Sequence, residues 1–173
     1  MINYSMEQVN KMTEQEFMHS VGVVFEHSPW VAKSAFGHHP FSSLDQMYEK
    51  MIEEMTNADM SLKLSLLRAH PDLGTRLEVS ESSKHEQQNA GLSQLSEEEY
   101  REFSLLNKKY IEKFDFPFIM AVKGQDKHSI KESMKTRINN QYEKEFKTAL
   151  SQVEKIARFR LVDMIVDENM STK

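Results

Sequence analysis

The sequence contains no cysteine, and only 5 glycines and 4 prolines interrupt its 173 residues. The lack of cysteine excludes a disulfide-bonded scaffold and any chemistry that needs a thiolate. The scarcity of helix-breaking residues means that long helices can form without interruption.

Long hydrophobic runs and an excess of positive charge are also missing. No apolar run approaches the ~20 residues that a membrane helix needs. The first residues lead directly into polar sequence, without the basic segment and apolar core of a signal peptide. The net charge of -5 disfavours nucleic-acid binding, because phosphate contacts need a basic surface. We therefore expect a cytoplasmic protein that binds neither membranes nor nucleic acid.

The residues that are abundant are those of an ordinary globular protein, with 39% hydrophobic and 28% charged residues. Methionine, leucine, glutamate and lysine dominate, and all of them favour helix. We predict an all-α fold in which residues 1–173 form one compact multi-helix domain, with a flexible tail or linker at about 167–173.

Helix starts are indicated where serine or threonine precedes glutamate or glutamine by three residues, as at Thr13, Ser43, Ser83 and Ser96. Apolar periodicity then predicts helices after Thr13 and Ser43, and at about 58–69, 86–95, 97–114, 126–139 and 142–166. Pro71 should end the third of these, which leaves His70 at a helix end. The polar stretch 71–84 is predicted to be a loop.

Metal and acyl-enzyme chemistry find little support in the motifs. His38 and His39 are adjacent and point in different directions on any regular element, and the sequence has no H-x-x-x-H pair or H-E-x-x-H motif. Both are interpreted as loop residues, and no metal site is predicted. No G-x-S-x-G motif is present to form a serine nucleophile.

Helix packing alone does not explain three segments, namely His70–Gly74, Ser83–Leu92 and Phe114–Gly124. Each also has a structural interpretation. His70 could cap the end of a helix, Ser83 and Glu86 could form a capping box, and the apolar run around Pro117 could be a buried connector.

Taken in order, these segments resemble the 2-oxo-4-hydroxy-4-carboxy-5-ureidoimidazoline (OHCU) decarboxylase family. The family motifs H-P-D-L-G, S-x-x-E-Q-x-x-A-G-L and F-P-F-I-x-A-V-x-G correspond here to His70–Gly74, Ser83–Leu92 and Phe116–Gly124. The segments Arg137–Asn139 and Ile156–Leu161 are also similar to the family. One departure is Asp115, which stands where the family usually has glycine.

The resemblance implies a helical decarboxylase that converts OHCU to (S)-allantoin and CO2 during urate degradation. In this substrate the carbon that bears the carboxylate and a hydroxyl lies next to a C=N bond. That bond can accept the electron pair as CO2 leaves, so no cofactor is expected. The enzyme must then move protons, which suits a histidine whose pKa lies near the working pH.

The resemblance also assigns roles to residues. It implies His70 and Glu86 as catalytic groups, and the substrate-binding residues Pro71, Ser83, Gln87, Ile119, Met120, Ala121, Val122 and Arg160. Helical geometry separates Arg160 from Arg158 by about 200°, and Arg160 borders the apolar stripe of Ile156 and Ala157.

As partners, the family implies the small-molecule substrate OHCU, a symmetric homodimer, and urate oxidase, either fused or separate. Two other hypotheses remain open: an acidic helical interaction module with methionine-rich faces, and a metal-dependent hydrolase of small amides. Convergence of His70, Glu86 and Arg160 on one pocket would favour the enzyme over the module. Metal analysis would test the hydrolase.

Overall fold

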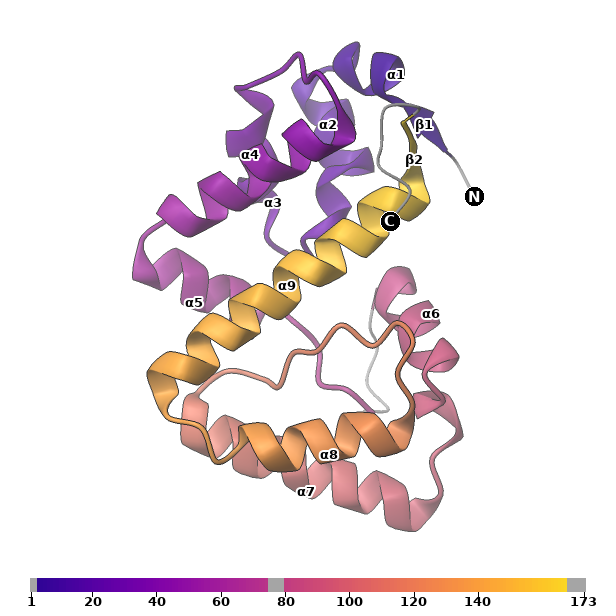
Figure 1. Cartoon of the computed structure of the whole chain (residues 1–173), viewed down its shortest axis with the longest axis vertical. Coiled ribbons are helices and arrows are strands. Elements are labelled where there is room, and N and C mark those ends of the chain that lie inside the picture. Colours follow the sequence, from indigo (N-terminus) through magenta and orange to yellow (C-terminus); the bar gives the residue numbers. More distant parts are fainter. Residues whose placement is uncertain (1–2, 75–79, 168–173) are drawn as a thin grey trace. The chain divides into compact units, whose positions relative to one another are not determined.

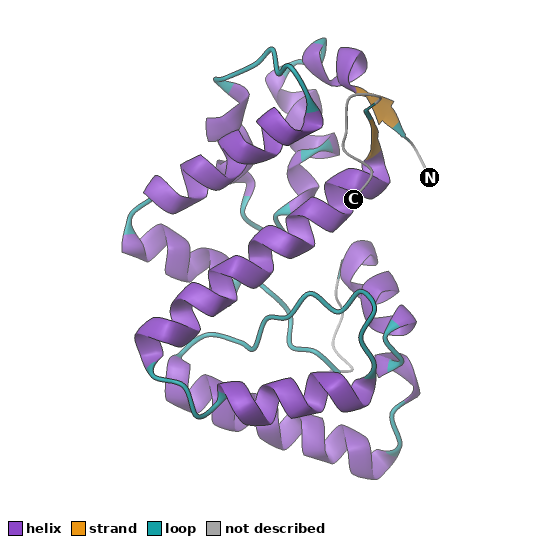
Figure 2. Cartoon of the chain, viewed as in Figure 1, coloured by secondary structure: helices purple, strands orange, loops and turns teal. Residues whose placement is uncertain are grey.

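A computed structural model describes residues 3–74 and 80–167 of the chain. Helices and their connecting loops make up almost all of this part (Figure 2). The strands in the described part are β1 (Tyr4–Ser5) and β2 (Ile165–Val166), which pair in parallel. The all-α prediction is confirmed.

The chain divides into two compact units. The described part of the first unit comprises residues 3–66 and 154–167. Its helices are α1 (Met6–Asn10), α2 (Glu14–Ser20), the 3-10 helix η1 (Gly22–Val24), α3 (Pro29–Phe36), α4 (Leu44–Asn57), most of α5 (Met60–Arg68) and the C-terminal half of α9 (Tyr142–Met164) (Figure 1). On α4, Met47, Met51 and Met55 form a buried stripe at helical spacing.

The second unit comprises residues 67–153. Its helices are α6 (Glu81–Asn89), the 3-10 helix η2 (Leu92–Gln94), α7 (Glu97–Phe114), α8 (Lys127–Arg137) and the N-terminal half of α9. Its core contains an aromatic cluster in which the rings of Phe114, Phe116 and Phe118 all contact that of Tyr110.

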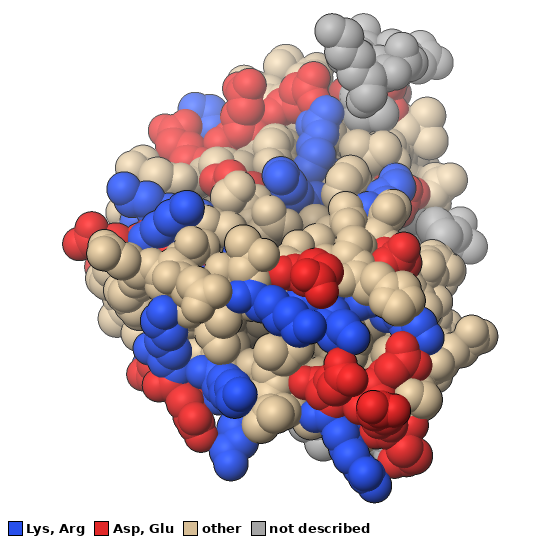
Figure 3. All heavy atoms as spheres, turned by 60° about the horizontal axis from the view of Figure 1, so that its bottom comes forward, with Lys and Arg blue, Asp and Glu red and all other residues tan. Residues whose placement is uncertain are grey.

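Ion pairs join α7 to α8 on the surface of the second unit. Lys127 pairs with Glu99 at 2.8 Å and Lys131 with Glu102 at 2.9 Å. Basic and acidic side chains are interspersed on the face drawn in Figure 3. Among the described residues, no helix is both long and apolar enough to cross a membrane.

Three of the predicted helix starts are confirmed. Thr13, Ser43 and Ser96 are N-cap residues, and each side chain accepts the N–H of the third residue along. Helix α7 has the bounds predicted for it, and α9 matches its predicted range to within two residues.

The fourth predicted helix start, at Ser83, is wrong. Helix α6 begins at Glu81, and its N-cap is Ser80, whose Oγ accepts the N–H of Ser83 at 3.1 Å. Ser83 therefore lies inside the helix, and the predicted loop 71–84 is wrong from Glu81 onward. The helix was missed because its first turn is polar and has no apolar periodicity. Of the same loop, residues 75–79 lie outside the described residues.

Shorter helices were also missed, namely α1 and α3. In α3, Pro29 occupies the first turn, where its fixed φ angle favours a helix start. Of the tail predicted at 167–173, only Asp167 is described, and its Oδ2 accepts the N–H of Leu44 at 2.6 Å. Residues 168–173 lie outside the described residues.

Candidate active site

His70 lies two residues beyond the end of α5, as predicted. Its backbone N–H donates to the carbonyl of Leu67 at 3.2 Å, and the residue is 8% exposed. Pro71 follows and prevents the helix from continuing. The imidazole is therefore attached to a constrained segment rather than to a long loop.

The residue at which the sequence departs from the family pattern contacts the end of this same helix. Asp115 ends α7 in the left-handed conformation, with φ 62° and ψ 25°, which glycine adopts most easily. Arg68 donates its Nε–H to the Asp115 carbonyl at 2.9 Å, and its Nη2 pairs with the carboxylate. Asp115 thus makes a turn that suits glycine, and it acquires an ion pair there.

The segment that follows His70 is held at its far end by two side chains. Asn107 of α7 donates from Nδ2 to the Leu73 carbonyl at 2.8 Å. The N–H of Gly74 donates to Oε1 of Gln87 at 3.1 Å. Gly74 has φ +70°, and a Cβ there would lie 3.2 Å from the ring of Phe103, so any other residue at this position would be strained. The Gly74–Gln87 bond joins the first motif to the second.

Helix α6 carries the three predicted site residues of the second motif. Ser83 and Gln87 are one helical turn apart and buried, with 6% and 9% exposure. Glu86 is half-buried on the same helix. The second unit therefore brings Gln87, and with it α6, to the segment that begins at His70.

The third motif contributes an irregular backbone segment between α7 and α8. The Ile119 carbonyl accepts Nη1 of Arg137 at 2.7 Å, and the Ala121 N–H donates to Oε1 of Gln152 at 2.9 Å. The Val122 carbonyl accepts the N–H of Gln125 at 3.0 Å. Within the described residues, neither backbone group of Met120 has a hydrogen-bond partner.

A buried ionic cluster supports this segment. Glu145 is 0% exposed and lies 2.6 Å from Arg137. The hydroxyl of Tyr110 also donates to Glu145 at 2.6 Å. Burial and the neighbouring Glu145 carboxylate raise the pKa of the Tyr110 phenol. Arg137 lies in a segment that resembles the family, but no role was predicted for it, and Tyr110 and Glu145 were not predicted.

Arg160 lies in the first unit, on the C-terminal half of α9. Its Nη2 donates to Oε1 of Glu26 at 2.9 Å, and its Nη1 donates to the Val24 carbonyl at 3.2 Å. Arg158 instead pairs with Asp45 and is partly exposed. Arg160 is 8% exposed, as expected for a residue that borders the apolar stripe of Ile156 and Ala157. Its contact with the substrate stays a prediction. The sequence offered no signal for Glu26, which is 134 residues away.

The predicted site residues are therefore divided between the units. His70, Pro71, Ser83, Glu86, Gln87 and residues 119–122 belong to the second unit, and Arg160 belongs to the first. Convergence of His70, Glu86 and Arg160 stays a prediction.

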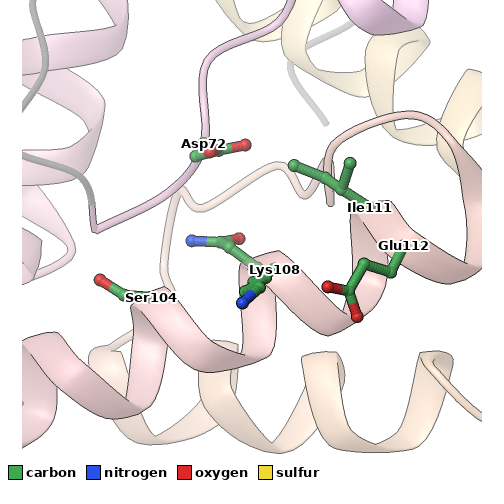
Figure 4. Close-up of a pocket in the computed structure, with 6 residues that line it drawn as sticks. Asp72, Ser104, Lys108, Ile111 and Glu112 are labelled. Atoms are coloured by element: carbon green, nitrogen blue, oxygen red, sulfur yellow. The ribbon is translucent and has the colours of Figure 1, made fainter.

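A pocket of about 340 Å³ lies beside α7 in the second unit, and Figure 4 shows its walls. It is lined by Asp72, Ser104, Asn107, Lys108, Ile111 and Glu112. Burial raises the pKa of the Asp72 carboxyl. None of the predicted site residues is among these six, so this pocket differs from the predicted site.

Histidines 38 and 39 lie in the turn after α3, as interpreted from the sequence. His38 bonds to Glu54 at 2.8 Å, and Nδ1 of His39 lies 2.6 Å from the Phe36 carbonyl. Within the described ranges, no group of three or more histidine, aspartate or glutamate side chains is placed to hold a metal ion.

Comparison with known proteins identifies the family. The family model for OHCU decarboxylase matches residues 10–162. An OHCU decarboxylase of Halalkalicoccus jeotgali is 43% identical over 96% of this chain and 94% of its own length. A uric acid degradation bifunctional protein of Bacillus subtilis is 42% identical over 95% of this chain, and the match spans 33% of that protein.

A solved structure of (S)-allantoin synthase matches with a TM-score of 0.78 and 28% identity, covering 94% of this chain and 54% of that one. The helical fold and the ordered motifs are those of a decarboxylase. The chain belongs to the OHCU decarboxylase family.

Proposed function

We propose that the chain catalyses the cofactor-free decarboxylation of OHCU to (S)-allantoin and CO2 in urate degradation. Family membership gives the reaction class. The structural observation that carries the proposal is the hydrogen bond between Gly74 and Gln87, because it joins the His70 segment to the helix of Ser83 and Glu86.

The substrate supplies its own electron sink. When the C–C bond to the carboxylate breaks, its electron pair enters the neighbouring C=N bond, whose nitrogen takes up a proton. The product is an enol. The enol then loses its hydroxyl proton to become the carbonyl of allantoin, and the adjacent carbon gains a proton on one face. The protein must position the substrate and move these protons.

In this proposal His70 moves the protons. The imidazole suits the role because it can both accept and donate a proton near neutral pH. A residue buried at a helix end and followed by proline has few conformations, so it can hold a base about 3 Å from a reacting atom. Glu86 orients the imidazole or the substrate hydroxyl and stabilises the imidazolium as it forms.

The remaining groups bind the substrate. Oε1 of Gln87 is occupied by Gly74, so its Nε2 is the group left to donate to a ring or ureido carbonyl. Ser83 supplies a hydroxyl on the same face of α6, and Pro71 supplies an apolar wall. Among residues 119–122 the backbone of Met120 is the part whose N–H and C=O are available for substrate. Arg160 binds the anionic or carbonyl-rich part through its planar guanidinium.

Replacement of His70 by Asn tests the assignment. His70→Asn should retain the fold while turnover of freshly generated OHCU drops by ~10²–10⁴-fold, the usual effect of losing an acid–base group. OHCU loss and the chirality of the allantoin should be followed together. His128→Asn, an exposed change on α8, is the matched control and should have wild-type activity. Near-normal turnover by a folded His70→Asn protein would refute the role.

Independence from metals follows from the same electron flow. Activity should survive exhaustive EDTA treatment, because the C=N bond does the work that a Lewis acid would do. Loss of activity with EDTA and recovery with zinc would contradict this part of the proposal and favour the hydrolase hypothesis.

We also propose that the chain acts as a homodimer in the cytoplasm. The family resemblance suggests the dimer, and Leu105 and Ile111 on α7, which are 53% and 37% exposed, are apolar side chains that a partner would cover. The absence of cysteine suits a reducing compartment. Sedimentation that shows only a monomer at micromolar concentration would contradict the dimer.

Urate oxidase is the proposed partner enzyme, because the substrate is made from oxidised urate. It would be either fused to this chain or separate from it. The chain spans a third of the bifunctional relative from Bacillus subtilis, which supports a fused arrangement. It also spans 94% of the decarboxylase from Halalkalicoccus jeotgali, which supports a separate one. Mass analysis of the native protein distinguishes the two.

A further inference from the structure

The backbone of the third motif is held by side chains and not by a helix or a sheet. The Ile119 carbonyl accepts Nη1 of Arg137, at the end of α8, at 2.7 Å. Two residues further on, the Ala121 N–H donates to Oε1 of Gln152, on α9, at 2.9 Å. A segment without regular structure is thus fixed at two points by side chains from two helices.

Arg137 cannot easily change its own position. Its Nε donates to Glu145 at 2.6 Å, and its guanidinium lies 4.3 Å from the centre of the Phe118 ring. Glu145, which is 0% exposed, also accepts hydrogen bonds from the Tyr110 hydroxyl at 2.6 Å and from Nδ2 of Asn140 at 3.0 Å. The Glu145 carboxylate thus accepts hydrogen bonds from three side chains, and its buried ion pair holds the Arg137 guanidinium beside the Ile119 carbonyl.

These two bonds fix the peptide planes on either side of Met120, because the Ile119 carbonyl shares a plane with the Met120 N–H and the Ala121 N–H shares one with the Met120 carbonyl. Met120 lies between the two fixed residues, is partly exposed, and has no hydrogen-bond partner for its N–H or C=O within the described residues. Partly buried backbone groups normally have a partner. Holding Ile119 and Ala121 in place therefore presents the peptide groups of Met120 in a fixed orientation.

We infer that Arg137 and Gln152 are positioning residues, which fix the backbone at Ile119 and Ala121 so that the peptide groups of Met120 meet the substrate. This inference rests on the proposed function. Neither side chain touches the substrate. Each acts only through the backbone that it holds.

Gln152→Met is the main test, because it removes the amide and nearly preserves the volume of a partly exposed side chain. It should lower kcat/KM for OHCU by about 10–100-fold, chiefly through a higher KM, because a displaced peptide group weakens substrate binding. Amide hydrogen exchange should become faster at residues 120–122 and stay unchanged in α7 and α9. Arg137→Lys should act in the same direction, because an ammonium group cannot bond both Glu145 and Ile119 with the same geometry.

Lys131→Met is the matched control. The substitution lies on α8, removes one positive charge and breaks the ion pair with Glu102, and Lys131 has no hydrogen bond or ion pair to residues 119–122. Its KM and its exchange pattern should be those of the wild type. A merely structural role for Gln152 would reduce the folded fraction and hence kcat, but it would leave KM unchanged.

A folded Gln152→Met protein with wild-type KM and wild-type exchange at residues 120–122 would overturn the inference. Failure of the wild-type chain to consume OHCU would overturn the proposed function instead. The exchange measurement would then still test whether Arg137 and Gln152 hold the segment.

Discussion

Arg160 in the first unit and Arg137 in the second make similar contacts. Each is paired with a glutamate that is at most 4% exposed, and each donates to one backbone carbonyl. They differ in what lies around the pair. Glu145 is shared by a tyrosine, an amide and Arg137, whose guanidinium lies against an aromatic ring.

The pairs also differ in sequence separation, which is 8 residues for Arg137 and Glu145 and 134 for Arg160 and Glu26. The local pair joins the end of α8 to the start of α9 and supports a neighbouring backbone segment. The distant pair ties the C-terminal helix to the N-terminal part of its unit. Two buried arginines with nearly the same bonds can therefore have different tasks: Arg137 supports a backbone segment, and Arg160, as proposed, binds the substrate.

Removing each glutamate should give the largest effects. Glu145→Ala and Glu26→Ala should each lower the free energy of unfolding by about 3–5 kcal/mol, because each leaves a buried guanidinium without its counter-charge. The loss should be larger for Glu145, since Tyr110 and Asn140 also lose an acceptor. Denaturant unfolding measures both values.

The control is Glu102→Ala, which breaks a partly exposed ion pair and should cost less than about 1 kcal/mol. If Glu26→Ala were as mild as Glu102→Ala, the buried pair of Arg160 and Glu26 would stabilise the first unit no more than a partly exposed pair does.

A smaller effect, on activity, should separate the tasks of the arginines on α9. Arg160→Lys should reduce kcat/KM for OHCU about 10–100-fold, because an ammonium cannot reproduce the planar fork. Arg158→Lys should be nearly silent, since Arg158 pairs at the surface with Asp45. The reverse ranking in steady-state assays would show that Arg158, and not Arg160, binds the substrate.

The last effect concerns the tyrosine that belongs to the second-unit pair. Tyr110→Phe should cost about 1–3 kcal/mol at neutral pH, because it removes a buried hydrogen bond to a carboxylate. Since the pKa of Tyr110 is raised in the folded chain, the folded state keeps its phenol proton where the unfolded state releases it, above about pH 10.

Stability that is fully present below that pH is therefore lost as the pH rises, with a slope of up to ~1.4 kcal/mol per pH unit. The Tyr110→Phe protein should lack this alkaline loss. Parallel alkaline unfolding curves for the two proteins would show that the phenol is not held by Glu145.

The long helices could be predicted from the sequence because capping residues and apolar spacing agree, as at Ser96 and along α7. Helix α6 could not, because its first turn is polar and is capped by Ser80 rather than by the more familiar Ser83–Glu86 pattern. The spacing of apolar residues predicts helices that bury one face in the core. A short polar helix has no such spacing and so is not predicted.

The candidate site shows the same limit. The motifs pointed to His70, Glu86 and the backbone at 119–122, and the local geometry of His70 at a helix end is as expected. The supporting bonds were not predicted, because the pairs Gly74–Gln87 and Ala121–Gln152 depend on how the chain folds back on itself. Neither glutamine stands in a pattern that marks it as a partner of a distant backbone group.

The contact between Arg68 and Asp115 has a consequence for how this sequence can change over time. The aspartate occupies a left-handed turn and is bound through both its carbonyl and its carboxylate by the arginine. Glycine at 115 would remove backbone strain but also the ion pair, and alanine would remove the ion pair and keep the strain. The effect of a mutation at either position thus depends on the residue at the other, 47 positions away. The two sites are epistatic, and they connect the start of the first motif to the start of the third.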